Sequence, residues 1–314
     1  MKIAVLIPIY NGARYLRQCL DSVLSQTGVE LEVFCRDDGS VDGTWELLSE
    51  FAARHANVHV VRQENAGVSV TRNRLMDDVS ESCGALAFVD ADDTIAPGMY
   101  AKLHEALVRT ESDIAECEWD GAERVIDDMS VYLLRRTAPG AWINVWNKLY
   151  RRSALGSLRF RDGLRFEEDL FFNLEVHAAA RRKVLVPGRF YAYRDNPDSA
   201  TRALDFRHYF ESTARRIRLS LEVFLEAGRI PAAQADAFRE ELSRDAFRMC
   251  LRKNLRKNPD AAERRELFGK AGAFFRECEG RGFSAIGLSP VPRAILACCK
   301  AGKYGLARGL VYLT

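Results

Sequence analysis

Three aspartates crowd the end of one apolar segment of the chain. Residues 85–89 are Ala-Leu-Ala-Phe-Val, and Asp90, Asp92 and Asp93 follow at once. An uninterrupted apolar run of this length is typical of a strand buried on both faces. Carboxylates this close repel one another and call for a positive charge. A divalent cation is the simplest such charge, because oxygen ligands select Mg²⁺ or Mn²⁺. The alternative interpretation is a solvated acidic loop after a core strand.

Regular alternation of strands and helices surrounds this segment. From Ile3 to Arg109, short apolar segments alternate with segments of helical spacing. This alternation predicts βαβ units and an α/β fold, with a mostly parallel sheet and helices on both faces. The predicted strands are residues 3–9, 31–35, 58–61 and 85–89, and the predicted helices are residues 13–26, 43–55, 68–79 and 98–109.

Polar residues gather where the predicted strands end. In parallel sheets of this kind, ligands bind beyond the carboxyl ends of the strands. The residues brought to that edge are Tyr10-Asn11, Asp37–Ser40, Asn65–Gly67, Arg72 and Asp90–Asp93. Turn chemistry explains any one of these segments, but their joint occurrence favours a binding site. The glycine motifs of dinucleotide-binding and P-loop proteins are absent, so nucleotide phosphates would be held through metal.

The second part of the chain is organised differently. Beyond Asp113 the alternation stops, although residues 113–119 and 184–193 predict further strands. From residue 204 the helical spacing predicts an all-helical region. We therefore expect one domain over residues 1–203 and a helical region over residues 204–314. The predicted helices there are residues 206–227, 232–257, 260–278 and 290–300.

Composition limits the location and the partners. The formal net charge is only +2, which argues against a nucleic-acid partner. The N-terminus carries no secretory signal, and no apolar run approaches the ~20 residues that span a bilayer. The eight cysteines are scattered without a C-x-x-C pair, as is typical of reduced thiols in a cytosolic protein. We expect a cytoplasmic location.

Taken together, the motifs resemble family 2 glycosyltransferases of bacterial cell-surface polysaccharide synthesis, which have the Rossmann-like GT-A fold. The matching residues are 7–11, 37–44, 64–69, 71–73 and 88–93, followed by Trp146–Tyr150, Glu168-Asp169 and Tyr191–Arg194. The resemblance implies a nucleotide-sugar-binding half over residues 1–112 and an acceptor and catalytic half over residues 113–203. It also implies transfer of a hexosyl or N-acetylhexosaminyl group from a nucleotide sugar, which we expect to be a UDP-sugar, to a glycan or lipid-linked acceptor.

The acidic motifs take separate roles under this resemblance. Asp92 would hold Mn²⁺ or Mg²⁺ on the donor diphosphate, with Asp90 assisting it or bonding the ribose, and Asp93 would be either a ligand or a support. Asp169 would be the base that takes the acceptor proton, with Glu168 orienting it or binding acceptor. The start of a helix is the alternative interpretation of this second pair. One base without a nucleophilic carboxylate predicts a single displacement with inversion.

Further residues are expected to contact the donor. The set is Pro8, Tyr10, Asn11, Asp38, Gly67, Arg72, Asp90, Ala91, Lys148 and Arg194. Pro8 and Tyr10 would flank the base, and Asp38 would contact the base or the ribose. Arg72, Lys148 and Arg194 would contact phosphate. Arg72 could instead form a salt bridge to Asp37 or Asp38, and Arg194 could be a surface residue. Trp142 and Trp146 would stack on an acceptor sugar or belong to the core.

Two other functions and a membrane contact are alternatives that the sequence leaves open. A nucleotidyltransferase should carry a glycine-rich basic loop after the first strand, but Tyr10–Arg14 fits this poorly. A non-catalytic protein that binds sugar nucleotides is the third possibility. The sequence after Glu279 has basic and apolar residues but no acid. It therefore predicts either an interfacial helix at the inner face of the membrane or a helix that packs back on the protein.

Overall fold

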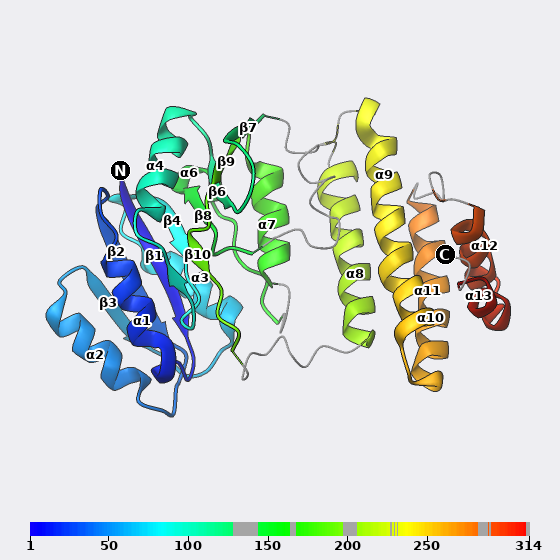
Figure 1. Cartoon of the computed structure of the whole chain (residues 1–314), viewed down its shortest axis with the longest axis horizontal. Coiled ribbons are helices and arrows are strands. Elements are labelled where there is room, and N and C mark those ends of the chain that lie inside the picture. The colour runs from blue at the N-terminus through cyan, green and yellow to red at the C-terminus, as the bar shows by residue number, and fades with distance from the viewer. Residues whose placement is uncertain are drawn as a thin grey trace. The chain divides into compact units, whose positions relative to one another are not determined.

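The chain forms two compact units, shown in a computed structural model (Figure 1). The first unit comprises Met1–Met129 and Ile143–Ser199, and the second comprises Ser130–Trp142 and Ala200–Thr314. The structure describes residues 1–127, 144–163, 168–196, 206–226, 228, 230, 232–281, 288 and 290–311.

An eight-stranded sheet forms the centre of the first unit. Its strands are β1 (Lys2–Ile9), β2 (Leu31–Asp37), β3 (Val58–Arg62), β4 (Cys83–Phe88), β6 (Ile114–Glu118), β7 (Arg124–Ile126), β8 (Lys148–Arg151) and β9 (Lys183–Pro187). Their order is β3-β2-β1-β4-β8-β6-β9-β7. The strands β3, β2, β1 and β4 are parallel, whereas β8 is antiparallel to both β4 and β6. The predicted α/β fold with a mixed, mostly parallel sheet is confirmed. Both expected halves contribute strands to the same sheet.

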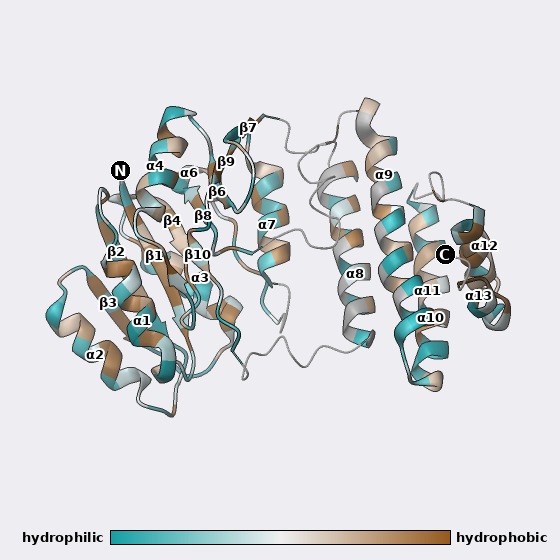
Figure 2. Cartoon of the chain, viewed as in Figure 1, coloured by the Kyte–Doolittle hydropathy of each residue, from teal (hydrophilic) through white to brown (hydrophobic). Residues whose placement is uncertain are grey.

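Each strand turns alternate side chains toward two different cores. Along β1, Ile3, Val5 and Ile7 enter one core, while Ala4 and Leu6 enter the other. Successive side chains of a strand point to opposite faces, so such a strand is apolar throughout. Figure 2 shows this hydrophobic colouring along β1 and β2. The first core is covered by α1 (Ala13–Leu24), α2 (Thr44–Arg54) and α4 (Met99–Arg109), and the second by α3 (Val68–Asp78), α6 (Arg152–Leu155) and α7 (Glu168–Ala179).

A short second sheet closes over the carboxyl end of β4. It pairs β5 (Thr94–Ile95) with β10 (Tyr191–Ala192) in antiparallel fashion. The Trp146 ring stacks on Tyr191 with ring centroids 4.0 Å apart, and Trp146 is buried. Trp146 therefore belongs to the core, whereas Trp142 lies outside the described residues. This pairing brings the Tyr-x-Tyr-Arg segment beside the acidic strand end.

All described elements of the second unit are helical. They are α8 (Phe206–Ser220) with a π-helical segment (Leu221–Glu226), α9 (Ala232–Ala246) with a second one (Phe247–Arg252), α10 (Lys253–Lys257), α11 (Ala261–Gly280), α12 (Pro290–Lys300) and α13 (Tyr304–Leu310). The C-terminal helices that the sequence predicts are thus present, and α13 is additional. On α12, Ile295, Leu296 and Cys299 are buried. Within the described ranges, no helix has the length and apolarity needed to cross a membrane.

Candidate active site

A buried guanidinium joins the two acidic motifs. Arg72 of α3 is only 3% exposed. Its Nη2 lies 3.0 Å from Oδ1 of Asp90, and its Nη1 lies 2.7 Å from Oε1 of Glu168 and 2.5 Å from Oδ1 of Asp169. Asp90 follows β4, while Glu168 and Asp169 begin α7. Three elements distant in sequence thus meet at one cation, with more negative charge around it than it neutralises.

Burial changes the acidity of this cluster. It raises the pKa of Asp169, an effect that Arg72 opposes and the neighbouring Glu168 reinforces. Burial likewise raises the pKa of Asp90, with Arg72 opposing and Asp169 reinforcing the change. A carboxyl group with a raised pKa exchanges its proton closer to neutral pH, as a general base requires. Asp169 therefore has the surroundings that a base needs.

Asp93 supports the strand end from inside. It is 1% exposed, and both of its carboxylate oxygens accept hydrogen bonds. The Tyr191 hydroxyl donates to Oδ2 at 2.7 Å, and the Arg194 backbone N–H donates to Oδ1 at 2.8 Å. Burial raises the pKa of Asp93 to about 7. With both oxygens engaged, Asp93 fastens β10 to the end of β4, which favours the supporting role over that of a direct metal ligand. Its relation to a metal stays a prediction.

Asp92 is the more accessible of the two candidate ligands. It is half-buried, and its Oδ2 accepts a hydrogen bond from the Asn196 amide at 2.9 Å. Within the parts of the chain that the structure describes, no three Asp, Glu, His or Cys side chains are arranged to hold a metal. Magnesium needs only one or two protein carboxylates when substrate phosphates complete its shell. Asp92 lies close enough to Asp90 to raise the pKa of Asp90, and the two carboxylates together fit such a partial site.

Arg194 lies beside this aspartate and forms no ion pair with the residues that the structure describes. Its Nε donates to the Asp92 carbonyl at 2.9 Å, and its Nη2 donates to Oε1 of Gln18 at 2.5 Å. The guanidinium also lies 4.8 Å from the centre of the Tyr15 ring. None of these partners is a carboxylate, and Arg194 makes no ion pair with a described residue. The structure thus brings Arg194 and Asp92 together.

Asp38 organises the loops that lead into α3. Its Oδ1 accepts hydrogen bonds from the Gln63 amide at 2.7 Å and the Ala66 N–H at 2.8 Å, and its Oδ2 accepts one from the Gly67 N–H at 2.9 Å. Gly67, with φ +85°, immediately precedes α3. Asp38 therefore sets the start of the helix that carries Arg72. Its expected contact with the nucleotide stays a prediction.

The carboxyl end of β1 presents an exposed aromatic ring. Tyr10 is 55% exposed. The next residue, Asn11, has φ +51°, and its N–H donates to the Ser40 hydroxyl at 2.8 Å. Pro8 is half-buried within β1, and Ala91 packs against the first core. Tyr10 is thus placed to stack on a planar group at the edge where the strands end.

Comparison with known proteins decides the family. Residues 4–166 match the sequence profile described as Glycosyl transferase family 2, and they make up just over half of the 314 residues. The chain belongs to glycosyl transferase family 2. The resemblance seen in the sequence is confirmed.

Curated relatives of this family 2 chain come from several bacteria. Glycosyltransferase GlyA of Streptococcus pneumoniae serotype 4 is 31% identical over 222 residues, which are 64% of this chain and 32% of GlyA. The uncharacterised glycosyltransferase EpsJ of Bacillus subtilis is 29% identical over 63% of this chain and 62% of its own length. The uncharacterised glycosyltransferase YibD of Escherichia coli is 27% identical over 86% of this chain and 83% of its own length. The chain thus spans about a third of GlyA and less than two thirds of EpsJ.

Solved structures share the fold. Residues 1–349 of S. aureus TarS superpose with a TM-score of 0.75 at 19% identity, over 99% of this chain and 90% of that one. The TarS complex with UDP-GlcNAc gives a TM-score of 0.76 at 18% identity, over 99% of this chain and 91% of that one. A mannosyltransferase of Pyrobaculum calidifontis, in complex with GDP-Man and Mn²⁺, gives 0.54 at 18% identity, over 99% and 86% of the two chains. At these identities the likeness concerns the fold, which is GT-A-like.

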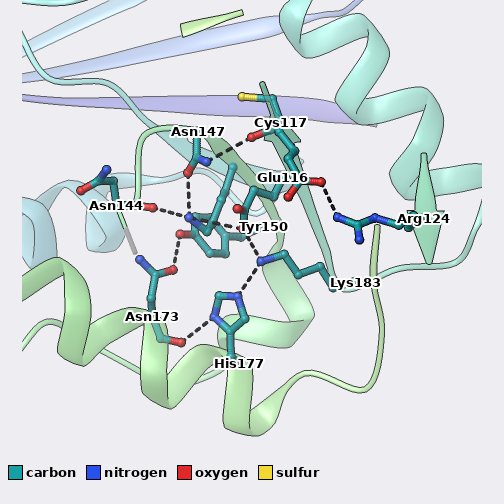
Figure 3. A network of polar contacts seen from close by, with 11 residues as sticks. Glu116, Cys117, Arg124, Asn144, Asn147, Tyr150, Asn173, His177 and Lys183 are labelled. Carbon is teal, nitrogen blue, oxygen red and sulfur yellow. Dashed lines mark hydrogen bonds and ion pairs between the residues drawn. The ribbon is translucent and has the colours of Figure 1, made fainter. Parts of the chain in front are cut away.

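Lys148 of the family 2 chain lies in a separate buried network. Figure 3 labels its partners Glu116, Asn144 and Asn147. Its ammonium group is 1% exposed and lies 3.6 Å from Oε2 of Glu116. It donates to the Asn144 carbonyl and, at 2.7 Å, to Oδ1 of Asn147. These partners occupy the ammonium inside the protein, so the structure does not support the expected contact of Lys148 with the donor diphosphate.

The same network fastens α7 to the sheet. Lys183 of β9 pairs with Glu116 and donates to Nε2 of His177 at 2.8 Å. His177 Nδ1 donates to the Asn173 carbonyl at 2.6 Å. The Nε2 atom must then be the acceptor, so the ring is neutral. Consistently, burial and the two lysines hold the pKa of His177 well below its ordinary value. The Asn173 side chain in turn accepts a hydrogen bond from the Tyr150 hydroxyl at 2.8 Å.

This network is structural support that sequence reasoning missed. Its members lie on β6, β8, β9 and α7, and Glu116 and Lys183 are 67 residues apart. No local spacing marks such a set, since charged residues are normally expected at the surface. It orients α7, whose first turn carries the acids that bind Arg72.

Glu116→Gln should lower the free energy of unfolding of the first unit by about 3–5 kcal/mol, because it removes a carboxylate charge that faces the buried ammonium groups of Lys148 and Lys183. Glu118→Gln on the same strand is the matched control. Glu118 pairs with the half-exposed Arg124, and losing such a pair costs about 0–1 kcal/mol. Urea unfolding followed by tryptophan fluorescence measures both variants, since Trp45, Trp119 and Trp146 all lie in the first unit. Equal losses for the two variants would contradict the role given to the network.

Proposed function

We propose that this family 2 protein transfers a sugar from a nucleoside-diphosphate sugar to an acceptor hydroxyl by single displacement, with inversion. The observation that carries the proposal is the meeting of Asp90, Glu168 and Asp169 at the buried Arg72. This contact connects the end of β4, where a donor would bind, with the pair Glu168 and Asp169. Burial raises the pKa of Asp169, as suits a base. A protein that only binds sugar nucleotides has no need of that second pair.

The donor side rests on Asp92, Arg194 and Tyr10. Arg194 donates to the Asp92 carbonyl and has no ion pair among the described residues, so its guanidinium is available to pair with a diphosphate oxygen. Tyr10 is exposed at the neighbouring strand end, where it can stack on the nucleobase. A bound Mn²⁺ or Mg²⁺, held by Asp92 with Asp90, would neutralise the departing diphosphate. The solved relative with UDP-GlcNAc supports a UDP-sugar and an N-acetylhexosaminyl or hexosyl group.

Asp169 acts on the acceptor. As the acceptor oxygen forms its bond to the anomeric carbon, the bond from that carbon to the diphosphate oxygen breaks. The acceptor proton passes to the carboxylate of Asp169. Arg72 holds this carboxylate in place, and Glu168 at the same guanidinium orients it or binds acceptor. One base and one leaving group suffice, so configuration at the anomeric carbon inverts.

The relatives support an acceptor at the cell surface. They include the minor teichoic acid biosynthesis protein GgaA and a poly(ribitol-phosphate) β-glucosyltransferase. We therefore infer a glycan or lipid-linked acceptor, met in the cytoplasm at the inner face of the membrane. Because α12 buries its apolar residues, contact with that surface would involve basic residues of the C-terminal region rather than insertion of α12.

Asp169→Asn should lower kcat for sugar transfer by about 10²–10⁴-fold, since a general base contributes that much. Affinity for UDP should stay within about twofold, because the donor contacts are elsewhere. Asp120→Asn, at a strongly exposed position, is the control and should match the wild type. Transfer assays and calorimetry with UDP measure the two effects. Unchanged transfer by Asp169→Asn would instead favour a protein that binds sugar nucleotides without catalysis.

The pH dependence of kcat/KM should report the base. Asp169 must be ionised to accept a proton, and burial raises its pKa. Activity should therefore be lost on acidification at a pH clearly above the value of about 4 that is ordinary for aspartate. Glu168→Gln removes a neighbour that raises this pKa, so it should move the acid limb to lower pH. If kcat/KM of the wild type fell only near pH 4, this would argue against Asp169 as the general base.

Asp92→Asn and Asp93→Asn should differ in how UDP binding depends on Mn²⁺. Asp92→Asn should weaken Mn²⁺-dependent binding about tenfold or more, whereas Asp93→Asn should lower the unfolding temperature and leave the metal dependence of the folded protein intact. Calorimetric titration of both variants with UDP, once in the presence of Mn²⁺ and once in the presence of chelator, measures these effects. If the wild type bound UDP equally well with and without chelator, the metal role of Asp92 would be overturned.

A further inference from the structure

A hollow with a volume of about 940 Å³ opens between α11 and α13 of the second unit. Its lining residues are Arg265, Phe268, Gly269, Gly302, Tyr304, Gly305, Arg308 and Gly309. The lining contains two arginines and two aromatic rings but no acid. The four glycines leave it unfilled, since a Cβ added at any of them would meet nothing within 4 Å.

Both lining arginines have uncompensated charges. Within the described ranges, neither Arg265 nor Arg308 forms an ion pair, and Arg265 lies 5.3 Å from the centre of the Tyr304 ring. The chain contains no acidic residue after Glu279, so α12 and α13 supply no counter-charge. The hollow is therefore positively charged and open to solvent.

A buried third arginine strengthens this field. Arg264 is 7% exposed. Its Nε donates to the Tyr304 hydroxyl at 2.8 Å, and its Nη1 donates to the Asn258 carbonyl. Neither partner carries a negative charge, although a buried guanidinium ordinarily has a carboxylate partner. Because the Tyr304 oxygen accepts from a cation, its own hydrogen is left to donate and is a stronger donor for it.

We propose that this hollow is a binding site for a phosphate ester, separate from the site on the first unit. Arg265 and Arg308 would pair with the phosphate oxygens, which the guanidinium fork fits well. The Tyr304 hydroxyl would donate to the same group, and the charge of Arg264 behind it would be compensated on binding. The ester comes either from a soluble compound or from a phospholipid head group. The proposal stands independently of the reaction proposed for the first unit.

Calorimetry of the full chain with sn-glycerol 3-phosphate tests the soluble source. We expect saturable binding that Arg265→Ala/Arg308→Ala weakens about tenfold or more, since each 1.4 kcal/mol of lost interaction is a factor of ten. Tyr304→Phe should weaken it about threefold. Arg293→Ala is the control: Arg293 is also exposed, lies on α12 and does not line the hollow. Thermal unfolding verifies that each variant remains folded.

Sedimentation with vesicles of phosphatidylcholine and phosphatidylglycerol at 3:1 tests the lipid source. Binding that the double variant loses, and that sn-glycerol 3-phosphate competes away, assigns the hollow to lipid head groups. Binding of the soluble ester alone assigns it to a soluble phosphate ester. The proposal is overturned if the wild type binds neither probe saturably, or if Arg293→Ala weakens binding as much as the double variant does.

Discussion

The charge of Arg72 is the constraint around which the first unit is assembled. A guanidinium removed from water is costly unless carboxylates surround it. Here Asp90, Glu168 and Asp169 do so, from the end of β4 and the start of α7. The dependence is mutual, because without Arg72 these acids would repel one another in a buried place. The ion pairs that stabilise the fold therefore also bring the end of β4 and the candidate base Asp169 together.

Two buried networks hold α7 at different points along its length. Its first turn is bound by Arg72, while Asn173 and His177 further along bond to Tyr150 and Lys183 of the sheet. A helix fixed in this way cannot rotate without breaking hydrogen bonds that water does not replace. Such support is what a catalytic carboxylate needs to stay within reach of its substrate. The neutral ring of His177 adds no charge that would change near physiological pH.

Local patterns in the sequence predicted the sheet and the edge where its strands end, because both depend on spacings of a few residues. The same patterns did not predict which charged groups, distant in sequence, come into contact. Asp93 was expected as a ligand or its support, and only its pairing with Tyr191, 98 residues away, distinguishes the two. Lys148 was expected at the diphosphate because a lysine in a recognised motif suggests a substrate contact, yet its partners among the described residues include Asn144, Asn147 and Glu116. The helix α13 gave no signal because its seven residues include two glycines.

The antiparallel strand β8 has a consequence for how the protein folds. It lies between β4 and β6, although it follows both in sequence. Until β8 has been synthesised and has paired, β4 is an open edge of the nascent sheet. It is an apolar strand whose backbone N–H and C=O groups are unpaired on that side. Pairings between distant segments are slow to form, so β8 completes the sheet late. A fragment that ends before residue 148 would keep this edge open and be prone to aggregation, which makes residues 1–112 a poor candidate for expression on their own.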